Sequence, residues 1–153
     1  MMSSFNRFFI LFLLATLAIF IQRGGFLNIY GIVPNLVMVF FISRIISGEG
    51  FSMIATVFLA VIASAFIVDP FWISEFSIMG AIILIVFGLR KRFTGNAITD
   101  LFIMTFLAEL LFYGSIRLLN ITSSFSVITV AFEFLYTILV GVPILVLSRR
   151  YFK

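Results

Sequence analysis

The chain has 153 residues, of which 63% are hydrophobic and only 10% are charged, and its formal net charge is +4. Too few charged side chains are present to cover a surface that faces water, which excludes a soluble globular protein. The apolar residues form long unbroken runs instead of alternating ten-residue strands, which excludes a membrane β-barrel. We therefore expect an all-α membrane protein, with residues 1–153 forming a single integral membrane domain.

The chain contains no cysteine and no histidine. Thiol catalysis, disulfide bonds, zinc sites built on Cys or His, and haem held by these residues are therefore excluded. No glycine-rich phosphate loop or nucleophile motif is visible. We expect no enzymatic activity, no cofactor and no metal. The basic residues flank the apolar runs, which predicts contact with anionic lipid head groups and not with nucleic acid.

Six apolar runs predict six transmembrane helices in a compact bundle. They cover about residues 8–21, 29–46, 51–68, 72–89, 97–119 and 125–147. The first run follows Arg7 but is not promptly followed by a signal-peptide cleavage site, so we expect it to be retained as a span. Pro34 is expected in the first turns of the second helix, where a missing N–H costs least. Asp69 and Pro70 are expected to end the third helix.

The distribution of Lys and Arg predicts the orientation of the bundle. If the N-terminus is cytoplasmic, eight basic residues lie inside, at positions 7, 44, 90–92, 149, 150 and 153, and two lie outside, at positions 23 and 117. Because short cytoplasmic loops carry the excess of positive charge, this bias predicts that both termini are cytoplasmic.

Two polar stripes are predicted on the last two spans, at residues 105, 109, 113 and 117 and at residues 129, 133, 137 and 141. Helical i,i+4 spacing places each set on one face, and a short connection predicts an antiparallel hairpin. Glu109 and Glu133 are each expected about 12 Å below the outer surface, so at least one carboxyl is expected to be protonated and to donate a hydrogen bond. Three interpretations stay open: a neutral pair that fixes packing, a contact for a partner helix, and a proton or cation site.

Arg44 and Asp100 are expected near the inner ends of the second and fifth spans. Their depths permit a salt bridge between them. The alternative is that Arg44 extends to the lipid head groups, as long basic side chains commonly do near the ends of membrane helices.

Two segments resemble the MreD family of bacterial rod-shape-determining membrane proteins. Residues 32–38, Ile-Val-Pro-Asn-Leu-Val-Met, are similar to the family's Pro-Asp-hydrophobic opening of the second span, with Asn35 in place of the usual Asp. Residues 65–69, Ala-Phe-Ile-Val-Asp, correspond to the family's Gly-Leu-x-x-Asp, without the glycine. Gly80 follows eleven residues after Asp69, where the family places a glycine about eight residues on. The chain length, six short spans and small loops agree with the family.

The resemblance implies a non-enzymatic scaffold of the cell-shape machinery that directs lateral peptidoglycan elongation, in the cytoplasmic (inner) membrane of a bacterium. It implies a single-span partner such as MreC and contacts with other elongation-complex proteins. Pro34, Asn35 and Asp69 are the positions matched to the family's motifs, whereas Arg44, Asp100, Glu109 and Glu133 are candidates from the residue pattern alone.

Two other functions fit the pattern. The MreD fold resembles the substrate-binding subunit of ECF vitamin transporters, although the first span has only Ala15 and Ala18 where that family carries Ala-x-x-x-Ala. Such a subunit needs an outward-facing polar pocket, for which residues 69–75 and the two glutamates are candidates. A small proton-coupled transporter that uses Glu109 and Glu133 is the other alternative.

Overall fold

The computed structural model describes residues 4–68, 73–92, 94–118 and 126–151. Within these ranges the helices are α1 (Ser4–Arg23), α2 (Leu36–Ile46), α3 (Phe51–Val68), α4 (Ile73–Leu89), α5 (Ala97–Leu118) and α6 (Val127–Tyr151), and a short 3-10 turn, η2 (Arg90–Arg92), follows α4. Each of the six predicted runs therefore contains a helix. Asp69, the predicted stop of the third run, lies outside the described residues.

Three of these helices, α1, α5 and α6, are long and apolar enough to cross a membrane. This indicates a membrane protein, as the composition predicts. The helix α1 is longer at both ends than the predicted 8–21, and α6 continues four residues beyond the predicted end at 147. The polar and charged residues at these ends extend the helices past their apolar runs, since apolarity alone does not decide where a helix ends.

The second predicted span is the one that the structure corrects most. Its helix, α2, begins at Leu36 instead of residue 29 and has only 11 residues, which corresponds to about 16 Å of helix. Asn35 is the N-cap, so Pro34 lies before the helix and not within its first turns. Residues 29–32 form a tight turn in which Tyr30 and Gly31 have φ values of 53° and 84°. Such left-handed backbone cannot be part of an α-helix.

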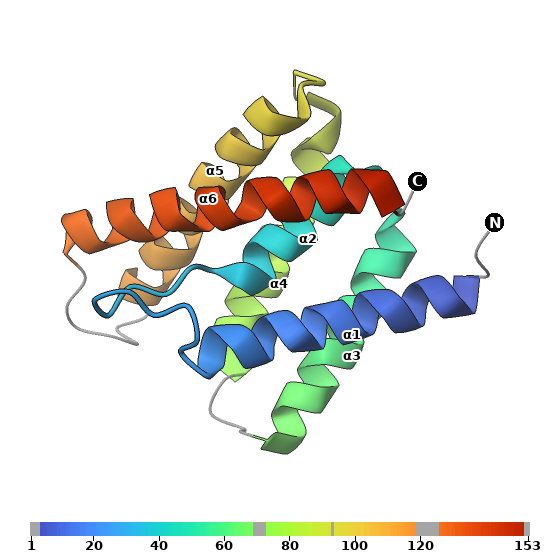
Figure 1. Ribbon diagram of the computed structural model, residues 1–153, viewed down its shortest axis with the longest axis horizontal. Coiled ribbons are helices and arrows are strands. Elements are labelled where there is room, and N and C mark those ends of the chain that lie inside the picture. Colours follow the sequence, from blue (N-terminus) through green and yellow to red (C-terminus); the bar gives the residue numbers. More distant parts are fainter. Residues whose placement is uncertain (1–3, 69–72, 93, 119–125, 152–153) are drawn as a thin grey trace.

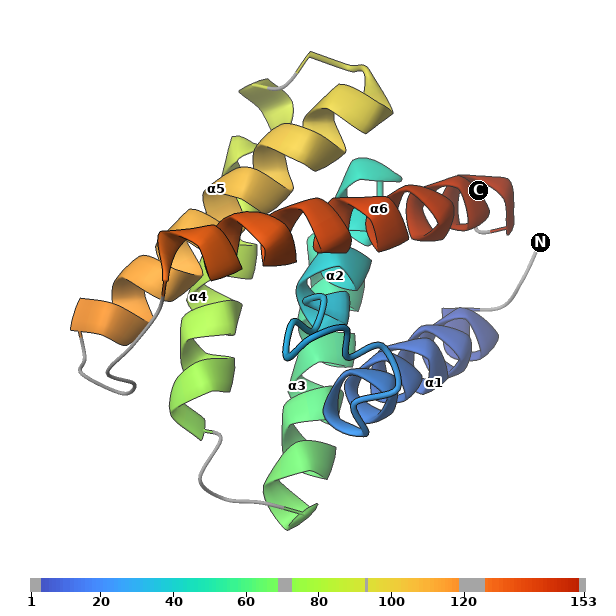
Figure 2. The same ribbon diagram turned by 60° about the vertical axis from the view of Figure 1, so that its left-hand side comes forward.

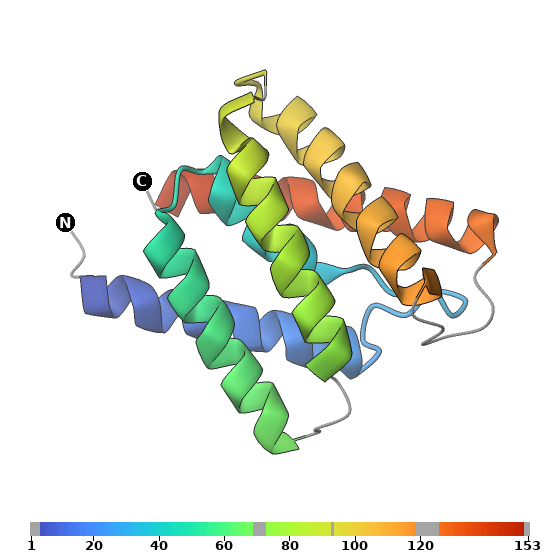
Figure 3. The ribbon, with the colours of Figure 1, turned by 180° about the vertical axis from the view of Figure 1, so that it is seen from behind.

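The helices form a bundle with α2 near its centre. Figure 1 shows α1 and α6 crossing the front of the molecule, while Figure 3 shows α3, α4 and α5 side by side behind them. Figure 2 shows the chain termini at the same end. We call this the inner end, after the orientation predicted from the sequence, and we call the opposite end the outer end.

Nearly every side chain of α2 is buried, because α1, α3, α4, α5 and α6 all pack against it. The apolar core includes an edge-on contact between the rings of Phe41 and Phe58, at 5.4 Å between centroids. By contrast, Leu11 and Ala15 are the buried residues of α1, and much of the remaining apolar surface of that helix is exposed. The centre of the bundle is therefore closed, whereas α1 keeps an apolar face for lipid or another helix.

Gly141 lets α6 lie close to α2. A Cβ atom at this position would lie 2.4 Å from Cγ2 of Val39 and 3.5 Å from Cδ2 of Leu101. Small residues at helix contacts are the usual way in which membrane helices approach one another closely. Val39 is β-branched and fully buried, so it has little freedom to move away.

We expect Gly141→Ala to destabilise the bundle by about 1–3 kcal/mol, because the added methyl group overlaps Val39. Thermal unfolding of the purified protein in detergent measures this loss. Gly114→Ala in α5 is the matched control, since a Cβ atom at Gly114 meets nothing within 4 Å. Equal melting temperatures for the two variants would contradict the close approach of α6 to α2.

Candidate functional site

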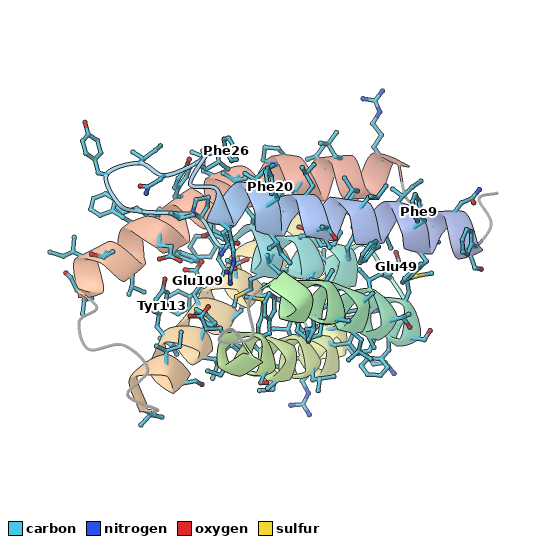
Figure 4. The ribbon with its side chains drawn as sticks, turned by 90° about the horizontal axis from the view of Figure 1, so that it is seen from below. Phe9, Phe20, Phe26, Glu49, Glu109 and Tyr113 are labelled. Carbon is cyan, nitrogen blue, oxygen red and sulfur yellow. The ribbon has the colours of Figure 1, made fainter. Side chains whose placement is uncertain are left out.

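Polar side chains gather at both ends of α2. The outer cluster comprises Asn35, Glu109, Tyr113, Glu133 and Thr137, and the inner cluster comprises Arg7, Arg44, Glu49 and Ser148. Figure 4 shows Glu109 and Tyr113 near one another, with Glu49 farther along the bundle. Because polar groups are costly in an apolar interior, each cluster is a candidate site.

The outer cluster begins with the N-terminus of α2. The Asn35 side chain accepts a hydrogen bond from the backbone N–H of Met38 at 3.2 Å, as an N-cap does. The backbone N–H of Asn35 donates to the Thr137 hydroxyl at 3.0 Å, and the backbone N–H of Val37 donates to Oε1 of Gln22 at 3.2 Å. Side chains from α6 and α1 therefore accept hydrogen bonds from the otherwise unpaired backbone N–H groups at the start of α2.

The two predicted polar stripes meet through Tyr113 and Glu133 and through Glu109 and Thr137. The Tyr113 hydroxyl donates a hydrogen bond to Oε2 of Glu133. Tyr113 lies five residues before the end of α5, and Glu133 lies six residues after the start of α6, so the hairpin brings them level. The interpretation of Glu109 and Glu133 as a hydrogen-bonded pair is not what the structure has, because Glu109 lies one turn deeper, beside Thr137.

Glu109 is the least satisfied member of the outer cluster. Its residue is 2% exposed, and among the described residues neither carboxyl oxygen has a hydrogen-bond partner. The Thr137 hydroxyl lies near this carboxyl group but outside hydrogen-bonding geometry, and Glu133 is close enough to act on it electrostatically. An unsatisfied buried polar group costs about 1–3 kcal/mol, and more when it is charged, so Glu109 reduces the stability of the fold.

A cavity of about 390 Å³ opens in the bundle at the outer end. The lining comes from the ends of α1, α2, α4, α5 and α6 and consists of Ile19, Gln22, Arg23, Val33, Asn35, Val37, Glu75, Phe76, Met79, Phe112, Tyr113, Ile116 and Glu133. Its size lies within the range of small-molecule sites, which typically combine an apolar lining with a few polar groups.

The inner cluster is organised by Glu49, a buried residue in the connection between α2 and α3. Its carboxylate forms ion pairs with Arg44 and, at 3.0 Å, with Arg7. Arg44 also donates to the Ser148 hydroxyl at 3.2 Å, and Arg90 donates to the backbone carbonyl of Glu49 at 2.8 Å. This network joins α1, α2 and α6 to the turn after α4.

The structure corrects the expected partners of Arg44 and Asp100. Arg44 is 2% exposed and pairs with Glu49, so it does not extend freely to lipid head groups. The Asp100 carboxylate instead accepts hydrogen bonds from the backbone N–H and hydroxyl of Thr94, at 2.9 Å and 2.8 Å. Asp100 lies in the first turn of α5, where a carboxylate is well placed to fix the preceding loop.

Sequence reasoning missed Glu49 and Gln22, whereas Glu75 belongs to residues 69–75, which were candidates for an outward-facing pocket. A detectable signal existed for Glu49, because it stands between two glycines, Gly48 and Gly50, five residues after Arg44. Gly48 has a φ of 92° and follows the C-cap residue of α2, which turns the chain so that Glu49 comes back to Arg44. For Gln22 no comparable local signal exists, since its role depends on how the ends of α1 and α2 meet.

The two clusters differ in what they can do chemically. In the inner cluster one carboxylate pairs with two guanidinium groups. The groups come from several elements, which suits a structural role. In the outer cluster, carboxyl and phenol groups adjoin a cavity, which suits binding of a proton or a cation. Within the described part of the chain, no group of three potential metal ligands is close enough to hold a metal ion.

Glu49→Gln is expected to cost about 3–5 kcal/mol of stability, because it leaves the Arg44 guanidinium buried without its counter-charge. Denaturant unfolding in mixed micelles measures the loss, and Asp100→Asn serves as the carboxylate control. The double variant Arg44→Gln with Glu49→Gln should lose clearly less than the sum of the single losses, because both removed groups belong to one pair. Additive losses for Arg44 and Glu49 would contradict the ion pair, whereas additive losses are expected for Arg44 with Asp100.

Comparisons with protein-family models, with curated proteins and with solved structures give no match to this chain. The resemblance to the MreD family therefore remains a prediction from the sequence.

Proposed function

We propose that the chain is a non-enzymatic scaffold of the bacterial machinery for cell shape and lateral peptidoglycan elongation, and that it binds a single-span partner of the MreC type in the cytoplasmic membrane. The observation that carries the proposal is an apolar groove between α1 and α6. Each of these two helices packs extensively against α2, and in the described part of the chain no comparable packing joins the two to each other. A groove of about 270 Å³ stays open between them, with Leu36 and Phe40 of α2 in its lining.

The chemistry of the groove fits a transmembrane helix. Its lining residues are Leu14, Leu17, Ala18, Ile21, Leu27, Leu36, Phe40, Val140, Ile144, Leu147 and Ser148. All but the last are apolar, so the occupant must be apolar as well. Ala18 leaves room for close approach of a helix backbone, which is the main source of affinity between helices in lipid. The alternative occupant, a lipid acyl chain, gives a different result in the experiment below.

A photoactivatable amino acid at Leu17 is expected to cross-link to the MreC-type protein of the same organism when the two are co-expressed in its membrane. The matched control is the same amino acid at Leu84 of α4, which is also exposed and apolar. Mass spectrometry identifies the adducts. Adducts with lipid alone at Leu17, or equal protein adducts at Leu17 and Leu84, would contradict docking in the groove.

The groove can be blocked without removing any charge. Ala18→Trp places an indole ring in the groove and is expected to reduce co-purification of the partner at least about tenfold, which corresponds to about 1.4 kcal/mol. Leu84→Trp should leave co-purification unchanged. Both variants leave the polar clusters unchanged. The melting temperature of each variant shows whether reduced co-purification comes from lost binding or from lost folding.

The proposal includes six membrane crossings with both termini in the cytoplasm. Its support is that Arg7, Arg44, Arg90 and Arg149 all lie at or near the inner end of the bundle, as the positive-inside rule requires. A green fluorescent reporter fused after Lys153 is expected to fluoresce, and an alkaline phosphatase fused there is expected to be inactive. Active phosphatase at this position would contradict the arrangement.

A second candidate function is that of a substrate-binding subunit of an ECF-type transporter. The outer cavity favours it, because this function needs a polar pocket on the external side. A subunit of this kind would co-purify with a membrane-embedded coupling protein and ATPases, whereas the scaffold would co-purify with a single-span protein. A small proton-coupled transporter is supported by the unsatisfied Glu109, and proton flux in liposomes that Glu109→Gln abolishes would support it.

A further inference from the structure

The wall of the outer cavity contains more carboxyl groups than guanidinium groups. Glu75 at the start of α4 and Glu133 in α6 contribute two carboxyl groups to its wall, and Arg23 at the end of α1 contributes one guanidinium. Arg23 is exposed to the surroundings, whereas Glu75 and Glu133 are half-buried. The wall therefore favours a cationic group over an anionic one.

The rest of the wall is apolar and aromatic. Phe76, Met79 and Phe112 line the cavity together with the ring of Tyr113. Aromatic faces attract organic cations through the ring quadrupole, and sites of this kind are the common means of recognising substituted ammonium groups. An inorganic cation would gain little from such a wall, because hard cations prefer several oxygen ligands. The lining therefore matches a ligand that has both an ammonium group and an apolar body.

A second observation lies beneath the cavity, at a residue that is not part of its lining. Glu109 lies one helical turn below Tyr113 on the same face of α5, and Glu133 acts on it electrostatically. Glu109 is 98% buried, and among the described residues neither of its carboxyl oxygens is hydrogen-bonded. A bound cation next to Glu133 would offset the carboxyl charges gathered beneath the cavity.

We propose that the outer cavity is a binding site for a small organic ammonium ion with an apolar or aromatic body, held by Glu75 and Glu133 and stabilised from below by Glu109. The site does not require the scaffold function, because it lies at the outer end of the bundle and the apolar groove opens between α1 and α6. Ligand binding and partner binding are measured separately, so either proposal can fail alone.

The test is calorimetric titration of the full chain in nanodiscs of zwitterionic lipid, with empty nanodiscs as the reference. Three probes share one aromatic body: phenethylammonium, the neutral 2-phenylethanol and the anionic phenylacetate. We expect phenethylammonium to bind at least about tenfold more tightly than either of the others. Equal binding of the neutral probe, or no binding of the cation, would overturn the proposal without recourse to any variant.

Variants of the glutamates test which carboxyl groups bind the cation. Glu75→Gln and Glu133→Gln are each expected to weaken phenethylammonium binding about tenfold, and Glu109→Gln is expected to weaken it as well. Asp100→Asn removes a carboxylate at the inner end and should leave the affinity unchanged. If all three cavity variants bind like the unmodified chain while their melting temperatures show that they are folded, the assignment of these residues is wrong.

Discussion

The structure depends on a short helix at the centre of an apolar bundle. At 11 residues, α2 is only about 16 Å long. Both of its ends are buried within the protein, where unpaired N–H and C=O groups cannot bond to water. Gln22, Asn35 and Thr137 satisfy or support the first turn, and the connection through Gly48 closes the last. The polar residues of the other helices are placed where this short helix needs them.

The same constraint explains why the two ends differ. At the inner end Arg44, in the last turn of the helix, pairs with Glu49, whose backbone N–H donates to the Arg44 carbonyl. At the outer end the residues before Asn35 form a turn, so the space between the ends of α1, α4, α5 and α6 is not filled by α2. A cavity with polar walls is the consequence. Ion pairs therefore hold the inner end together, whereas the outer end contains a cavity.

Helix positions were largely predictable because apolar runs report them directly, as for α3, whose bounds agree with residues 51–68. The start of α2 could not be predicted in the same way, because residues 29–34 continue the apolar run. The left-handed backbone at Tyr30 and Gly31 shows that these residues form a turn and not a helix. The two polar stripes followed from helical spacing, but the pairing of Tyr113 with Glu133 depends on how far α5 and α6 are shifted along each other. Glu49 was missed because its burial arises from α1, α2 and the turn after α4 together.

The helix α1 connects the two proposed sites. Leu14, Leu17 and Ala18 line the apolar groove, whereas Ile19, Gln22 and Arg23, in the last turn and a half of the same helix, line the cavity. With few buried residues, α1 is held mainly by its contacts with α2 and α3 and by the ion pair between Arg7 and Glu49. A partner helix that shifted α1 would change the cavity wall, and a ligand that fixed this wall would change the groove by the same coupling free energy. In the proposed scaffold, the affinity for a partner would therefore depend on what occupies the outer cavity.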